Sequence, residues 1–103
     1  MKIIHKANVD AAFQSFLGQA VYMHAEATSS VFVRNFRVSL QEAVIAGEGS
    51  FRIGLRFDGH GWLRMEGLTH YEWDNQERLI LAGFDDLGRM NVTLELGREP
   101  FPE

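Results

Sequence analysis

Apolar residues between Asn8 and Ala20 recur every three or four positions, the spacing that places them on one face of a helix. The residues on this face are Val9, Ala12, Phe13, Phe16, Leu17 and Ala20. Asn8 can cap the helix by accepting a backbone hydrogen bond, and Gly18 can adopt the left-handed conformation that often follows the last turn. The pattern therefore predicts a helix over residues 8–18.

After residue 20 the apolar period changes to two, which is typical of strands with one buried face. Strands are expected over residues 21–28, 31–40, 51–57, 62–65, 68–73, 78–84 and 89–96. The pattern leaves open whether 62–65 and 68–73 are continuous or broken at Gly67. Residues 41–50 fit either a helical turn or a continuing strand, and the proline-containing residues 97–103 are expected to form a frayed tail.

The order of these elements predicts one α+β domain that spans residues 1–103. An amino-terminal helix would pack on a six- to seven-stranded, mostly antiparallel curved sheet. Short connections between successive strands favour a meander over parallel crossovers. The pattern does not choose between a flattened barrel and a two-layer sandwich for this sheet.

The composition fits such a domain, because 46% of the 103 residues are apolar and 12% are aromatic, enough for one hydrophobic core. The chain has no cysteine, which excludes disulfides and thiolate ligands. No run approaches the roughly 18 apolar residues of a spanning helix, and no apolar leader follows the first basic residues. We expect a cytoplasmic protein without a membrane segment.

The charge is acidic overall, at −4, and it is unevenly distributed. Residues 1–57 carry a net +2, whereas residues 58–103 carry a net −6. Phosphate contacts require clustered lysine and arginine, so this distribution argues against nucleic acid as a partner. It is more compatible with a basic protein partner.

One acidic and aromatic region stands out as a candidate contact for such a partner. Large rings at interfaces bury area, and surrounding charges accelerate the encounter. The candidate partner-binding residues are Tyr71, Trp73, Asp74, Glu77, Asp85 and Asp86. Tyr71 and Trp73 have the same phase along their strand, so the alternative is that both belong to the core.

Two His/Glu pairs suggest a different kind of site. His24 and Glu26 are two residues apart, as are His70 and Glu72, so each pair projects from one face of its strand. Together the four side chains would form a polar pocket between the helix and the sheet, suited to a small ligand or to acid–base chemistry. The competing interpretation is solvent-facing ion pairs.

The sequence offers no recognisable active site beyond this. No serine lies in a Gly-x-Ser-x-Gly elbow and no glycine-rich phosphate loop is present, so we expect no catalytic residues, no cofactor and no metal. The leading hypothesis is a small interaction protein of the inhibitor or immunity type, and the alternative is the His/Glu pocket. A third hypothesis is a homodimer that buries Phe32 and Phe36.

Overall fold

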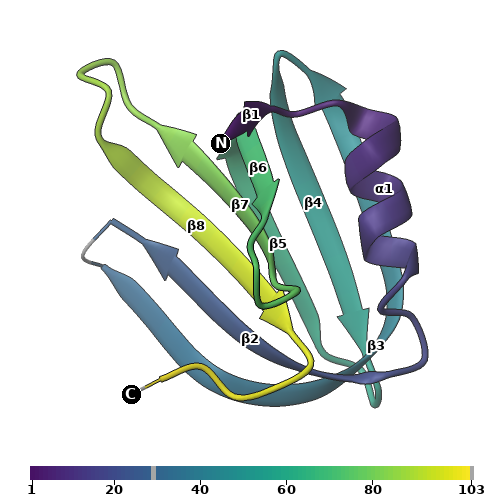
Figure 1. The fold of residues 1–103 in the computed structure, drawn as a ribbon. Coiled ribbons are helices and arrows are strands. Elements are labelled where there is room, and N and C mark those ends of the chain that lie inside the picture. The colour runs from purple at the N-terminus through teal and green to yellow at the C-terminus, as the bar shows by residue number, and fades with distance from the viewer. Residues whose placement is uncertain (29, 103) are drawn as a thin grey trace.

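The computed structural model describes residues 1–28 and 30–102, and Figure 1 shows their fold. These residues form one helix and eight strands: β1 (Lys2–Ile3), α1 (Lys6–Gln14), β2 (Ala20–Ala27), β3 (Val31–Glu48), β4 (Ser50–Phe57), β5 (Trp62–Leu68), β6 (His70–Trp73), β7 (Leu79–Phe84) and β8 (Met90–Gly97). The strands pair in antiparallel fashion in the order β1-β6-β7-β8-β2-β3-β4-β5. The molecule is therefore one mostly antiparallel sheet.

The α+β prediction of a helix over residues 8–18 packed on six to seven strands is wrong. In the part of the chain that the structure describes, eight strands form one open sheet, with β1 and β5 at its edges. Strand β1 has only two residues, too few to leave a periodic signal in the sequence. The nine-residue helix is about 14 Å long, whereas eight strands span about 34 Å. Such a helix cannot cover the sheet.

The helix also begins and ends earlier than expected, at Lys6 and Gln14, with His5 rather than Asn8 at the N-cap position. The apolar pattern continued to Phe16 because the turn that follows the helix keeps Phe16 buried. Gly18 does adopt the left-handed conformation, with φ 76°, and its N–H donates to the Leu40 carbonyl at 2.8 Å. None of the helices in the described residues is long and apolar enough to cross a membrane.

Strand β3 is the longest element, and its second half contains most of the segment 41–50 that the sequence left undecided. Its first half pairs with β2 and its second half pairs with β4. The turn to β4 requires glycine at position 47, because φ is 111° there and a Cβ would lie 2.6 Å from the Ser50 carbonyl oxygen. Through β3 the sheet bends, so that β5 contacts β7 and β8.

The chain passes from β5 to β6 through Thr69, so the break lies two residues beyond the expected Gly67. Gly67 instead has φ 78° and lies where the register between β4 and β5 shifts. The carbonyl oxygen of Gly67 lies so close to Gly83 on β7 that a Cβ on Gly83 would overlap it. This close approach holds β5 against β7.

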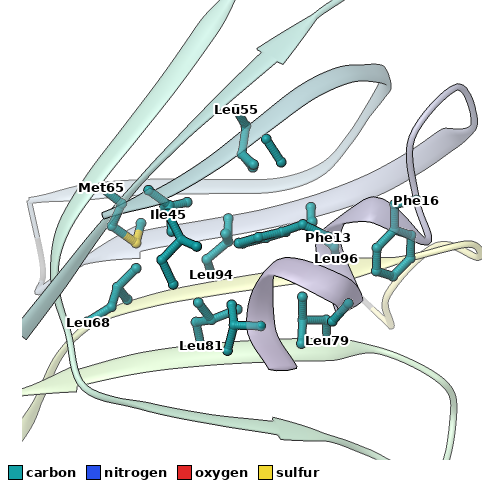
Figure 2. Packing of buried hydrophobic residues seen from close by; sticks show 14 of the residues in the cluster. Phe13, Phe16, Ile45, Leu55, Met65, Leu68, Leu79, Leu81, Leu94 and Leu96 are labelled. Atoms are coloured by element: carbon teal, nitrogen blue, oxygen red, sulfur yellow. The ribbon is translucent and has the colours of Figure 1, made fainter. Parts of the chain in front are cut away.

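The core lies on the inner face of the bent sheet. Figure 2 shows Phe13 and Phe16 packed among side chains from the strands, including Leu55, Leu79 and Leu96. The alternation predicted for residues 51–57 is confirmed: Phe51, Ile53, Leu55 and Phe57 are buried. The helix contributes Val9, Ala12 and Phe13 to the same cluster. The face of the sheet that carries these residues is therefore the inner face.

The carboxyl-terminal segment is not frayed, because Phe101 is only 3% exposed. The Asn35 side chain accepts a hydrogen bond from the Phe101 N–H at 2.6 Å and donates one to its carbonyl at 3.0 Å. Arg34 donates to the Pro102 carbonyl from Nε and Nη2. These bonds hold the segment against β3, a long-range contact that leaves no trace in local sequence.

Candidate binding surfaces

A hollow between α1 and β6 contains two of the aromatic residues that the sequence singled out. Its volume is about 430 Å³, and it is lined by Asn8, Ala11, Ala12, Ser15, Tyr71 and Trp73. We call it the Trp73 hollow. Tyr71 is 8% exposed and accepts a hydrogen bond from Asn8 Nδ2 at 3.3 Å, so it forms part of the core and part of the wall.

Trp73 is the exposed aromatic of this hollow, with 44% of its surface accessible. Its ring stacks on the ring of Phe16, with centroids 5.7 Å apart and planes 25° apart. Phe16 is fully buried, and the Arg98 guanidinium carbon lies 4.5 Å from its ring centroid. Trp73 is therefore held in place by the core while much of its indole faces solvent.

The acidic residue that follows Trp73 builds the turn between β6 and β7. Asp74 Oδ1 accepts hydrogen bonds from the N–H groups of Gln76 and Arg78, both at 2.9 Å. Its Oδ2 lies 3.7 Å from Arg78 Nε. The Asp74 charge is thus compensated within the turn, and its main role in the structure is to fix the backbone.

Asp85 builds the turn between β7 and β8 in the same way. Its Oδ1 accepts from the N–H groups of Leu87 and Arg89 at 2.9 Å, and its Oδ2 lies 2.9 Å from Arg89 Nε. The backbone hydrogen bond from Arg89 lowers the pKa of Asp85, with further lowering by the Arg89 side chain and the Leu87 N–H, against a raising effect of burial.

These two turns lie at opposite ends of β7, a six-residue strand about 20 Å long. The structure therefore places Trp73, Asp74 and Glu77 together at one end. Asp85 and Asp86 lie at the other end. The six candidate partner-binding residues do not form one patch, because local sequence spacing does not reveal which end of a hairpin each turn occupies.

Glu77 differs from its counterpart in the second turn. Both turns require a left-handed residue before the closing arginine, and Gly88 fills that position with φ 75°. Glu77 fills it with φ 59°, a conformation that is unfavourable for a residue with a side chain. Glu77 is exposed, so its carboxylate is presented to solvent beside the Trp73 hollow.

His24 lies on the outer face of the sheet but is 4% exposed, since Phe32 and Phe101 contact its ring edge-on. Arg34 Nη1 donates to its Nδ1 at 3.0 Å, and Glu26 Oε1 lies 3.3 Å from its Nε2. This environment shields the imidazole from any ligand and explains it as part of the contact with the carboxyl-terminal segment.

His70 and Glu72 lie on the same outer face, on β6. The register aligns Glu72, Ile80, Glu95 and His24 in one row across β6, β7, β8 and β2. Three strand spacings, about 14 Å, separate the two His/Glu pairs. The structure therefore does not bring the pairs together, and it places both on the face opposite α1.

Other ligands of His70 and Glu72 are local. Thr69 Oγ1 lies 2.7 Å from His70 Nδ1, the Phe84 ring packs edge-on against the imidazole, and the Met1 amino group lies 3.7 Å from Glu72. No group of three or more His, Asp or Glu side chains in the described residues is arranged to hold a metal ion.

Sequence reasoning missed a second aromatic surface, on the outer face of β3, β4 and β5. A hollow of about 410 Å³ lies there, lined by Val44, Ala46, Arg52, Ile53, Gly54, Trp62 and Arg64. We call these residues the Trp62 face. Trp62 is 59% exposed and pairs with Arg56, while Arg64 pairs with Gly54. The alternating basic residues of β4 were visible in the sequence, but the register that places Trp62 beside them was not.

Phe32 and Phe36 are both exposed, as a dimer interface would require. The register places Phe32 opposite Glu26 and Phe36 opposite Met23, on either side of a shift at Asn35. Met23 faces inward and Glu26 faces outward, so the two phenylalanines lie on opposite faces of β3. One flat interface cannot bury both, and the homodimer remains a prediction.

Comparison with known proteins settles the family. A family model described as "Protein of unknown function (DUF1806)" matches residues 3–101. The chain belongs to the DUF1806 family. It is similar to the uncharacterized protein YojF of Bacillus subtilis (strain 168), at 32% identity over 115 aligned residues that cover 98% of each chain.

The fold is also that of a solved DUF1806 structure. The crystal structure of the Bacillus subtilis YojF protein matches with a TM-score of 0.92 and 34% identity, over 99% of this chain and 97% of that one. The match supports the open antiparallel sheet with a short helix and overturns the expected helix-covered sheet. The family description and the relative's name state no ligand or reaction, so the function is argued from geometry.

Proposed function

We propose that this protein is a binding domain that recognises a basic segment of a partner protein at the Trp73 hollow. The observation that carries the proposal is the position of Trp73: half-exposed, held by the buried Phe16 ring, and forming a wall of an apolar hollow of about 430 Å³. Interfaces concentrate their binding energy in such aromatic anchors. A partner would insert an apolar side chain between α1 and β6.

The rigidity of this site supports binding. An aromatic side chain that is already held by the core loses little conformational freedom when a partner arrives, so more of the contact energy appears as affinity. Ala11, Ala12 and Ser15 form the opposite wall, and these small side chains leave the hollow open. The exposed wall lies on a helix and a strand, which are more rigid than a loop.

The basic character of the partner is inferred from Glu77. Asp74 is compensated by Arg78, whereas no ion pair to Glu77 is found among the described residues. Glu77 keeps an unfavourable backbone conformation that glycine fills in the twin turn. Strain of this kind clusters at functional sites, which supports a role for the carboxylate in partner recognition.

The test is affinity capture with the immobilised full-length chain, followed by identification of bound proteins by mass spectrometry and measurement of the purified pair by calorimetry. We expect Trp73→Ala to weaken binding at least about 30-fold, as truncation of an interface anchor does. Ala11→Glu, which fills the hollow from an exposed helix position, is expected to weaken it similarly without affecting the core. Added salt should slow association.

Trp62→Ala is the matched control, because it removes an equally large exposed aromatic from the other surface. The proposal holds if the partner is lost by Trp73→Ala and Ala11→Glu and kept by Trp62→Ala. It is overturned if every captured protein is kept by both Trp73 hollow variants, or if Trp62→Ala loses the partner to the same extent.

An inhibitor or immunity role would be one form of this function, in which the bound partner is blocked. The proposal places that binding in the cytoplasm, a prediction with which the cysteine-free sequence is compatible. The alternative of a ligand or acid–base site at His24, Glu26, His70 and Glu72 receives less support, because the two pairs lie apart on the face opposite α1.

A further inference from the structure

We propose that the Trp62 face binds a small anion that carries a planar ring, at a site separate from the Trp73 hollow. The hollow there, of about 410 Å³, has the size of a pocket for a small ligand. Its lining combines an exposed indole, the small residues Ala46 and Gly54, and the guanidinium groups of Arg52 and Arg64. The proposal goes beyond partner binding at Trp73 and does not depend on it.

The first argument is the glycine at position 54. It lies in the interior of β4, paired on both sides, where glycine costs about 0.5–1 kcal/mol relative to alanine. Its φ is not positive, so the backbone does not require glycine there. A Cβ at Gly54 would meet only Trp62, 3.8 Å from Cζ3, within 4 Å. The absent side chain leaves a flat floor beside the indole, on which a planar ring can lie.

The second argument is the charge of the rim. No ion pair involves Arg52 among the described residues, and Arg64 meets Glu66 at 3.5 Å with both side chains at least 65% exposed. An exposed pair of this kind is weak and exchanges readily for a better anion. Two guanidinium groups beside one hollow favour a carboxylate or phosphate, which they bind through charge-assisted hydrogen bonds.

The third argument limits the size of the ligand. Glu42 lies 3.1 Å from Arg56, and with Glu66 it places acidic groups around the hollow. The whole chain carries a charge of −4. A long polyanion would meet these acidic groups and lose the counterion-release gain that drives nucleic-acid binding. A small ligand, with its anionic group confined to Arg52 and Arg64, avoids this repulsion.

The ring and the anion together define the ligand class. Aromatic stacking on tryptophan is sequence- and substituent-tolerant, so the ring can belong to a nucleobase or to a simple arene. Aromatic carboxylates and nucleoside phosphates share the required chemistry. The experiment must therefore separate these two sources from each other and from their isolated parts.

Binding can be observed at each tryptophan separately, because the chain has only two. The ¹⁵N-labelled full-length protein gives two indole N–H signals, which Trp62→Phe and Trp73→Phe assign. The probes are adenosine monophosphate, 2-naphthoate, adenosine and inorganic phosphate. We expect at least one of the two ringed anions to shift the Trp62 signal and saturate, with adenosine and phosphate at least about tenfold weaker. The Trp73 signal should not move.

Two variants separate the site from general surface binding. Arg52→Gln should weaken the ringed anion about tenfold, whereas Arg37→Gln, at an exposed arginine on the first half of β3, should leave it unchanged. Gly54→Val fills the floor of the hollow and should abolish the Trp62 shift, while its thermal unfolding shows a folded protein. If that variant does not fold, Arg52→Gln still decides.

Adenosine monophosphate alone would identify nucleoside phosphates, 2-naphthoate alone would identify aromatic carboxylates, and saturation by both would support the shared chemistry. The proposal is overturned if neither ringed anion shifts the Trp62 signal at millimolar concentration. It is also overturned if phosphate binds as tightly as the ringed anions, or if Arg37→Gln weakens binding as much as Arg52→Gln.

Discussion

The two tryptophans occupy opposite kinds of position. Trp73 lies at the end of β6 on the inner face, with its ring stacked on the buried Phe16. Trp62 lies at the start of β5 on the outer face, beside Gly54. Both are exposed, yet only Trp73 continues into the core. The difference teaches that exposure alone does not identify a binding residue, since one indole supports the fold and the other rests on it.

The largest expected effect comes from comparing two strand glycines. Gly83→Ala should destabilise the fold by at least about 4 kcal/mol or prevent folding, because the new Cβ would overlap the Gly67 carbonyl oxygen and lie 2.7 Å from Val92 Cγ2. Gly54→Ala should leave stability unchanged or raise it by up to about 1 kcal/mol. Urea unfolding of both variants checks this. Equal losses would mean that Gly54 is structural and would weaken the case for the Trp62 face.

The tryptophans themselves should differ by a smaller amount. Trp73→Ala is expected to cost about 2 kcal/mol, since it removes a half-buried ring and exposes Phe16. Trp62→Ala should cost less than about 0.5 kcal/mol, as surface substitutions do. Thermal unfolding should show a fall in Tm of about 10 °C for the first variant and little change for the second. A larger loss for Trp62→Ala would break the comparison.

The sequence predicted the parts of the molecule that depend on local order. The alternation of Phe51, Ile53, Leu55 and Phe57 is confirmed because burial of one strand face imposes a period of two. The helix end was misplaced because the following turn keeps Phe16 buried in helical phase. Strand count and sheet closure depend on pairing between distant segments, such as β1 with β6, which periodicity does not encode.

The candidate surfaces show the same limit. Trp73 was found because acidic and aromatic residues follow one another in the chain, but the same reasoning joined it to Asp85 and Asp86, at the other end of β7. Trp62 was missed because its neighbours come from β3 and β4, which only the register of the sheet reveals. Sequence locality therefore favoured one tryptophan and concealed the other.

The twin turns offer a sharper test of the Trp73 surface. Glu77→Gly should stabilise the fold by about 1 kcal/mol, because glycine adopts the left-handed conformation without strain. Gly88→Glu in the second turn should destabilise it by a similar amount. Urea unfolding measures both changes. If Glu77→Gly also weakens partner binding while it raises stability, the carboxylate serves recognition; unchanged partner binding would assign Glu77 no role in it.

The smallest effect concerns the turn that lies away from Trp73. The Arg89 N–H and the other donors lower the pKa of Asp85 in the folded chain, so the folded state binds this proton less tightly than the unfolded state. The ionised carboxylate therefore contributes stability above the unfolded pKa, about 3.9, and that contribution is lost as pH falls through the lower folded pKa. Asp85→Asn should lower Tm slightly at neutral pH, and the deficit should shrink in acid.

Thermal unfolding between about pH 7 and about pH 2.5 measures this deficit, with Asp86→Asn as the control that removes an equal charge from the same turn without touching these hydrogen bonds. A deficit that is constant with pH would show that the hydrogen-bond geometry, not the charge, holds the turn. Asp85→Asn should leave partner binding unchanged, because the turn lies about 20 Å along β7 from Trp73. Loss of the partner would instead join the two acidic turns into one surface and contradict the division between them.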